Sequence, residues 1–134
     1  TKGAGAYLNE KRIRVTKLDR IANALLGTGY VAGSARALDE YLKMYQIMAE
    51  RSQGVRRAGS AALDLAYVAC GRLDGFYEKG LKPWDIAAGA LMITESGGIV
   101  GEFSGESEYL YKGDVIAASP KIFGQMITLL TPFA

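Results

Sequence analysis

The sequence contains no histidine and a single cysteine, Cys70, among its 134 residues. Without histidine, this chain cannot support Ser-His-Asp catalysis, histidine-mediated proton transfer or the common zinc motifs. A lone cysteine excludes a disulfide framework and a multi-cysteine zinc site. Because an unpaired thiol is typical of a reducing compartment, we expect a cytoplasmic protein.

Long apolar runs and a strong charge bias are also missing. No stretch approaches the ~20 apolar residues that span a bilayer. Sixteen Lys plus Arg against fourteen Asp plus Glu leave a net charge of only +2. We therefore expect no membrane segment and no direct nucleic-acid binding, which usually needs a basic surplus. With a hydrophobic content of 49%, the chain is long enough to form one core. It is too short for two ordinary domains.

Hydrophobic patterning alternates between strand and helix periods along the whole chain, without repeats or low-complexity linkers. The predicted strands are 11–16, 21–28, 55–58, 73–78, 98–103 and 114–118. The predicted helices open at Ser34, span 60–71, follow Pro83 and begin at Ser119-Pro120. This order of elements predicts an α/β sandwich.

The helix that opens at Ser34 is interpreted as a packing element. Asp39 and Lys43 can pair at i, i+4 on its solvent side. Its apolar residues recur at helical spacing and predict a buried stripe. That stripe comprises Leu38, Tyr41, Leu42, Tyr45 and Met48.

A single carboxylate, Asp85, opens an otherwise apolar helix. Pro83 suits the first turn and Gly97-Gly98 the C-terminal stop, so Asp85 should lie where the helix dipole favours an anion. No charge occurs from there to Ile93, so we expect the helix to be enclosed on all sides, with Trp84 packed to fix it. Two interpretations remain open: a helix-terminal acid that contributes ~0.3–1 kcal/mol, or a carboxylate that faces a cleft, a cation or donors.

Two further sites could contact a ligand. Gly59-Ser60-Ala61 precedes a helix, so backbone N–H groups are exposed there and Ser60 can either cap the helix or contact a ligand hydroxyl. Glu78 ends an aromatic strand. Its carboxylate could accept hydrogen bonds from sugar hydroxyls, or it could form a surface salt bridge with Lys79 or Lys82.

Other charged residues are interpreted as structural. Asp64 is the only acid in its apolar helix, and we expect it to pair with Arg57, Arg72 or a backbone donor. Arg51, Arg56 and Arg57 form a small basic cluster, which we interpret as a solvated or carboxylate-paired patch. A contact between this cluster and another protein remains an alternative.

Three segments resemble the inositol monophosphatase family, the metal-dependent sugar phosphatases related to fructose bisphosphatase. Residues 84–98, WDIAAGALMITESGG, resemble its C-terminal signature, and 3–15, GAGAYLNEKRIRV, resemble its glycine-rich segment and following strand. Residues 56–78, RRAGSAALDLAYVACGRLDGFYE, are similar to its SuhB-like bacterial branch. The resemblance implies that 1–134 form a single unit, the C-terminal half of this fold: a layered α/β sandwich with a mixed sheet between helices.

The resemblance also implies an activity, the Mg²⁺-dependent hydrolysis of inositol 1-phosphate or a related polyol or sugar phosphate by a homodimeric enzyme. At the matching positions, Asp85 is implied to be a catalytic residue that ligates Mg²⁺ near the substrate. Gly59, Ser60, Ala61 and Glu78 are implied to contact the polyol. Some SuhB-like members are linked to ribosomal RNA transcription. The alternative is therefore a phosphatase-like module that binds proteins of the transcription antitermination machinery.

Two of the family's metal-binding segments have no counterpart here. The family's metal site also draws on a glutamate-rich helix and an Asp-Pro-(Ile/Leu)-Asp-Gly-Thr loop, and neither occurs in residues 1–134. Asp85 alone cannot hold Mg²⁺, because this ion prefers octahedral oxygen ligation. We therefore expect the chain to be the downstream half of a larger unit and to be inactive by itself.

Overall fold

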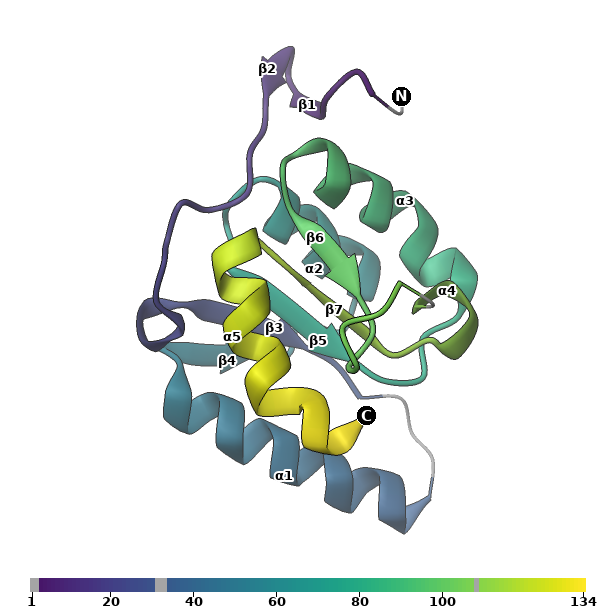
Figure 1. Cartoon of the computed structure of the whole chain (residues 1–134). Coiled ribbons are helices and arrows are strands. Elements are labelled where there is room, and N and C mark those ends of the chain that lie inside the picture. The colour runs from purple at the N-terminus through teal and green to yellow at the C-terminus, as the bar shows by residue number, and fades with distance from the viewer. Residues whose placement is uncertain (1–2, 31–33, 108) are drawn as a thin grey trace.

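The computed structural model describes residues 3–30, 34–107 and 109–134, with every side chain among them except that of Tyr111. Within these residues, the main sheet has five strands in the order β4-β3-β5-β7-β6 (Figure 1). These strands are β4 (Gly54–Arg56), β3 (Leu25–Thr28), β5 (Gly75–Glu78), β7 (Val115–Ala118) and β6 (Ile99–Gly101). β3 pairs in parallel with β4 and β5, whereas β7 runs antiparallel to β5 and β6. The sheet is therefore mixed, as expected.

Helices cover both faces of this sheet and make a layered sandwich (Figure 1). One face packs against α1 (Ala35–Arg51) and α5 (Pro120–Leu130), and the other against α2 (Ala61–Ala69) and α3 (Pro83–Glu95). The short helix α4 (Tyr109–Lys112) was not predicted. Single-turn 3₁₀ helices occupy Ile21–Asn23 and Thr131–Phe133. No helix among the described residues has the length and hydropathy needed to cross a bilayer.

Alternation along the buried strands divides the core between these two helical layers. On β5, Phe76 packs with α2 and α3, while its neighbour Tyr77 packs with α1 and α5. On β7, Ala117 likewise packs on the side of α2 and α3, and Ile116 on the side of α1 and α5. Successive side chains of a strand point to opposite faces, so each short strand supplies both halves of the core.

The helix starts follow the sequence signals. Ser34 caps α1 by accepting a hydrogen bond from the Ala37 backbone N–H at 3.2 Å, and Ser60 caps α2 by accepting from the Leu63 N–H at 3.2 Å. Pro83 and Pro120 lie in the first turns of α3 and α5.

Two predicted strands at the start of the chain are wrong in extent. Only Lys11–Arg12 (β2) of the predicted strand 11–16 forms a strand, paired with Tyr7–Leu8 (β1) in a small hairpin apart from the main sheet (Figure 1). Val15 leaves the strand pattern because its N–H donates to the Ser96 carbonyl at 3.1 Å, after α3. In the predicted strand 21–28, residues 21–23 are helical and only β3 is a strand. The other predicted strands and the helix 60–71 are present, with ends within two residues of expectation.

The predicted stripe of α1 is also partly wrong. Met44 and Met48 are its buried residues, whereas Leu38, Leu42 and Tyr45 are exposed. The stripe is rotated because the two methionines, one turn apart, face the sheet. The predicted pair on the solvent side is confirmed, since Lys43 Nζ lies 3.2 Å from Asp39 Oδ2.

The expectation that α3 is enclosed on all sides is wrong. Its buried residues, Ile86, Gly89, Ala90 and Ile93, lie along one face. Trp84 is 77% exposed, so it does not pack to fix the helix. Ala87, Ala88, Leu91 and Thr94 are exposed on the other face, where small or singly placed apolar side chains can remain in contact with water at little cost. An absence of charge therefore did not require enclosure.

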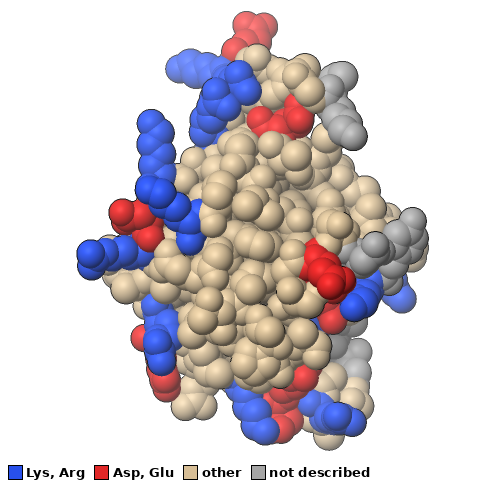
Figure 2. Space-filling view, in the orientation of Figure 1, with Lys and Arg blue, Asp and Glu red and all other residues tan. Residues whose placement is uncertain are grey.

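Charged side chains of both signs lie mainly around the margin of the face shown in Figure 2. The centre of this face, where α5 lies, is largely uncharged (Figures 1 and 2). This mixture agrees with the small net charge of +2.

Candidate functional site

A cavity of about 370 Å³ lies where three parallel strands end, and we call it the polar cavity. Gly29 follows β3, Arg57 follows β4 and Glu78 ends β5, while the starts of α2 and α3 complete the wall. Crevices at the carboxyl ends of parallel strands, bordered by helix N-termini, commonly bind ligands and favour anions. The lining residues are Gly29, Tyr30, Arg57, Gly59, Ser60, Ala61, Ala62, Glu78, Leu81 and Asp85.

The structure brings all the sequence-predicted site residues together in this cavity. Gly59 has φ +90°, a left-handed conformation that favours glycine and turns the chain into α2. Ser60 accepts the capping hydrogen bond described above. Its hydroxyl can still donate a hydrogen bond to a ligand, because accepting one bond leaves the O–H free.

Glu78 is only 6% exposed. The pKa of its carboxyl is raised to about 7, chiefly by burial and also by the nearby charges of Asp64 and Asp85, while Arg57 acts in the opposite direction. Gly29 packs directly against the carboxylate, so a side chain at that position would overlap it. A carboxyl with this pKa exchanges its proton near neutral pH, so it can either accept or donate hydrogen bonds to hydroxyls.

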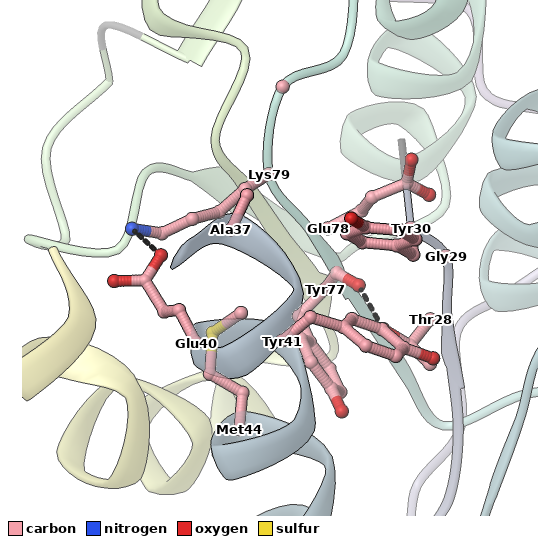
Figure 3. Close-up of a pocket in the computed structure, with 11 residues that line it drawn as sticks. Thr28, Gly29, Tyr30, Ala37, Glu40, Tyr41, Met44, Tyr77, Glu78 and Lys79 are labelled. Atoms are coloured by element: carbon pink, nitrogen blue, oxygen red, sulfur yellow. Dashed lines mark hydrogen bonds and ion pairs between the residues drawn. The ribbon is translucent and has the colours of Figure 1, made fainter. Parts of the chain in front are cut away.

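The alternative interpretation of Glu78, a surface salt bridge with Lys79 or Lys82, is contradicted by the structure. Lys79 Nζ instead lies 3.0 Å from Glu40 Oε1 (Figure 3), and no ion pair among the described residues includes Glu78. The two residues are adjacent at the end of β5, and adjacent residues of an extended chain point to opposite sides.

Asp85 has the geometry of a helix-terminal acid. The Lys82 backbone N–H donates to Asp85 Oδ2 at 3.0 Å, and the Asp85 N–H donates to the Lys82 carbonyl at 2.9 Å. Among the described residues, Asp85 Oδ1 has no hydrogen-bond partner. The helix-cap interpretation is therefore correct, and it leaves one oxygen available to a ligand in the cavity.

Asp64 is the contribution to the site that sequence reasoning missed. It is 2% exposed, and burial raises the pKa of its carboxyl to about 6. The expected pairing of Asp64 with Arg57, Arg72 or a backbone donor is wrong for the described residues, because Arg72 lies 5.6 Å from the Tyr67 ring centroid instead. The sequence did contain a signal for this role, a single acid in an apolar helix. Such an acid, when it has no partner, shifts the pKa of the acids around it.

Arg57 is exposed, as expected for a solvated patch with Arg51 and Arg56. It also lines the polar cavity, where its guanidinium donates to the Tyr30 carbonyl at 3.5 Å. Its position directly after β4 places it there, because β4 lies beside β3 at the same edge of the sheet.

The described residues do not complete a metal site. No three His, Cys, Asp or Glu side chains among them are close enough together to hold an ion. Asp85 fits one ligand position, because carboxylate oxygen is what Mg²⁺ prefers, but octahedral ligation requires further donors.

Known proteins similar to this chain come from one family. The model of the inositol monophosphatase family matches residues 1–131. The Nus factor SuhB of Pseudomonas aeruginosa is 46% identical over 134 residues, which cover 98% of this chain and 49% of that protein. The chain spans about half the length of the curated relatives it matches.

Solved structures show the same fold. The suhB extragenic suppressor protein of Bartonella henselae has a TM-score of 0.90 and 38% identity, covering 96% of this chain and 49% of that one. The Thermotoga maritima IMPase has a TM-score of 0.86 and 33% identity, covering 97% and 49% of the two chains. With the family model matching almost its whole length, the chain belongs to the inositol monophosphatase family.

Proposed function

We propose that this chain forms the polyol-binding half of a Mg²⁺-dependent phosphatase that hydrolyses inositol 1-phosphate or a related polyol phosphate. The observation that carries this proposal is the meeting of Gly59-Ser60-Ala61, Glu78 and Asp85 in one cavity of about 370 Å³. These residues come from three separate parts of the sequence. Membership of the inositol monophosphatase family supports the reaction class.

In this proposal, the start of α2 and Glu78 bind the hydroxyl groups of the substrate. Ser60 and the backbone N–H groups of the first turn offer donors, and Glu78 offers an acceptor when it is ionised. Arg57 favours that ionised form, because its positive charge opposes the rise in the Glu78 pKa. The polar cavity would thereby select compounds with several adjacent hydroxyls.

Asp85 would be one ligand of the metal. Its Oδ2 is oriented by the Lys82 N–H, which fixes the carboxylate and leaves Oδ1 for coordination. Bound Mg²⁺ would supply an activated water and stabilise negative charge on the phosphoryl group. The remaining ligands would come from residues outside this chain, because the described residues provide no cluster of three donors.

The test is Mg²⁺-dependent phosphate release from inositol 1-phosphate by a polypeptide in which an upstream half of the family precedes this chain. We expect Asp85→Asn to lower turnover by about 100-fold or more, since a neutral amide is a poor Mg²⁺ ligand. Asp39→Asn is the matched control, because that acid is exposed on α1 and pairs only with Lys43. The 134-residue chain alone should release no phosphate.

Two results would count against the proposal. Full turnover in Asp85→Asn would contradict the metal role of this residue. A folded wild type that releases no phosphate from inositol 1-phosphate would contradict the phosphatase function itself.

A second candidate is a protein-binding module of the transcription antitermination machinery. A specific observation favours it, since the relative from Pseudomonas aeruginosa is named a Nus factor. Arg56 is exposed and does not line the polar cavity, so it separates the two functions better than Arg57 does. Capture of purified transcription factors that is lost in Arg56→Ala but kept in Asp85→Asn would favour the binding module.

Two properties of the assembly belong to the same proposal. We infer a location in the cytoplasm, which the free thiol of Cys70 supports, and, from the family resemblance, a homodimer. Sedimentation of the purified chain measures its association, and a strictly monomeric species at micromolar concentration would count against a dimer formed by this half.

A further inference from the structure

A second cavity of about 280 Å³ adjoins the polar cavity, and we call it the tyrosine pocket (Figure 3). Gly29, Tyr30 and Glu78 line both cavities, so they form a common wall. The other lining residues of the tyrosine pocket are Thr28, Ala37, Glu40, Tyr41, Met44, Tyr77, Lys79 and Gly80. The function proposed above uses only the polar cavity and assigns nothing to this one.

Aromatic rings and small side chains dominate the wall of the tyrosine pocket. The ring centroids of Tyr30 and Tyr41 lie 5.1 Å apart and the rings are tilted by 40°. Ala37, Tyr41 and Met44 come from successive turns of α1 and therefore share one face of that helix. Surfaces of this kind favour a flat apolar group, which can pack against the tyrosine rings.

The acids at the tyrosine pocket do not make it a site for a cation. Glu40 already pairs with Lys79, whose Nζ also donates to the Phe133 carbonyl and lies 5.3 Å from the Phe103 ring centroid. Glu78 is only partly ionised near neutral pH, since the pKa of its carboxyl is about 7, and the positive charge of Arg57 nearby offsets its negative charge. The pocket therefore carries little uncompensated charge, and a neutral occupant fits it better than an ammonium group.

We propose that the tyrosine pocket binds a neutral planar ring carried by a phosphorylated polyol whose hydroxyl groups occupy the adjoining polar cavity. This inference rests on the proposed function and narrows its substrate class to polyol phosphates with a planar apolar substituent. The common wall of Gly29, Tyr30 and Glu78 separates the binding position of the ring from that of the hydroxyl groups. A substrate that spans it would place its hydroxyls on one side of Glu78 and its ring on the other.

The test compares two ligands that differ only in the ring: phenyl β-D-glucopyranoside 6-phosphate and methyl β-D-glucopyranoside 6-phosphate. Calorimetric titration of the 134-residue chain measures binding without requiring turnover or a complete metal site. We expect the phenyl compound to bind about tenfold more tightly, because a buried ring removes apolar surface from water. Ala37→Phe should fill the tyrosine pocket and abolish this advantage.

The matched control is Ala49→Phe, the same change at an exposed position farther along α1 that does not line the pocket. It should keep the phenyl advantage. Circular dichroism and thermal melting of both variants establish that they are folded.

Each remaining outcome decides between the inferences. Equal binding of the phenyl and methyl compounds would overturn the ring site while leaving the polyol site intact. Binding of the phenyl compound alone, lost in Ala37→Phe, would support the ring site and contradict the polyol site. Binding of neither compound by the folded chain would overturn both. Tighter binding of the 2-(trimethylammonio)ethyl glucoside 6-phosphate than of the phenyl compound would identify a cation site and overturn the neutral ring.

Discussion

The polar cavity and the tyrosine pocket share a wall, but they differ in the kind of sequence signal that marks them. The polar cavity is built from chain segments with distinctive local chemistry, a glycine before a helix and an acid behind a proline. The tyrosine pocket takes one of its walls from α1, where Tyr41 and Met44 have the spacing of ordinary core residues. Residues that a motif identifies therefore describe only half of this concave surface.

Charge separates the two cavities as well. The polar cavity is bordered by Glu78, Asp85 and Arg57, with Asp64 buried close enough to raise the Glu78 pKa. In the tyrosine pocket, Glu40 is neutralised by Lys79. Experiments that change one side of Glu78 at a time should therefore separate electrostatic from apolar binding.

The largest expected effect is the pH dependence of folding that Glu78 introduces. Its pKa is about 7 when folded and 4.5 ordinarily, so the native state keeps its proton to higher pH than the unfolded chain. The contribution of Glu78 to stability should therefore be greatest below pH 4.5 and fall as the pH rises to about 7, by up to about 3 kcal/mol. Urea unfolding between pH 4.5 and 8 measures this slope, which Glu78→Gln should flatten.

The raised pKa of Asp64 should likewise make stability fall as the pH rises. Glu106→Gln, at an exposed acid, is the control and should leave the slope unchanged. A slope that survives intact in Glu78→Gln would place the titrating group elsewhere.

Removal of the buried charge at Asp64 should change the pKa of Glu78 in the polar cavity, although Asp64 does not line that cavity. With Asp64→Asn, we expect the pKa of Glu78 to move down towards its ordinary value, because one of the charges that raise it is gone. Stability at pH 8 should rise by about 1–2 kcal/mol, since one costly buried charge is removed. Carbon NMR titration of the Glu78 carboxyl measures the shift, and an unchanged titration would show that the two acids do not interact.

A methyl group in the common wall should disturb both cavities at once. Gly29→Ala would push the Glu78 carboxylate from its position, and we expect binding of methyl β-D-glucopyranoside 6-phosphate to weaken about tenfold, or ~1.4 kcal/mol. Gly124→Ala is the control, because that glycine has open space around its Cα and lies on α5. Equal affinities in the two variants would show that the position of Glu78 is unimportant for the polyol.

The smallest effect should come from the Tyr41 hydroxyl. Tyr41→Phe keeps the ring, so we expect the preference for the phenyl over the methyl glucoside phosphate to change by less than about twofold. Tyr41→Ala should remove much of that preference. Calorimetry of the two variants separates a contribution of the ring from one of the hydroxyl, and a large loss in Tyr41→Phe would mean that the pocket recognises a polar group.

Sequence reasoning predicted the order of the main elements because the buried strands and capped helices carry local signals. Ser34 and Ser60 cap their helices as expected, and the mixed sheet implied by the family resemblance is present. The sequence pattern overestimates the length of the first strand, because the N–H of Val15 donates to the carbonyl of Ser96, eighty-one residues away in the sequence. Such a partner leaves no mark in the local pattern.

The candidate site shows the same division. The positions of Ser60, Glu78 and Asp85 in one cavity agree with the predicted set, while their chemical roles stay predictions. That Arg57 lines this cavity was missed because it depends on β4 and β3 lying side by side. The alternative of a salt bridge between Glu78 and Lys79 is excluded because the direction of each side chain follows from the strand pleat rather than from proximity in sequence.

The four residues of β5 give the molecule one further property. Phe76 and Tyr77 anchor the two opposite core layers, and Glu78 follows directly on the same strand. A slip of one residue would exchange the two aromatic rings between layers that are already filled, so the register is locked. Amide hydrogens along β5 should then exchange only through global unfolding. The carboxylate at the common wall is thus held by a strand locked in register, and ligands must adapt to it rather than displace it.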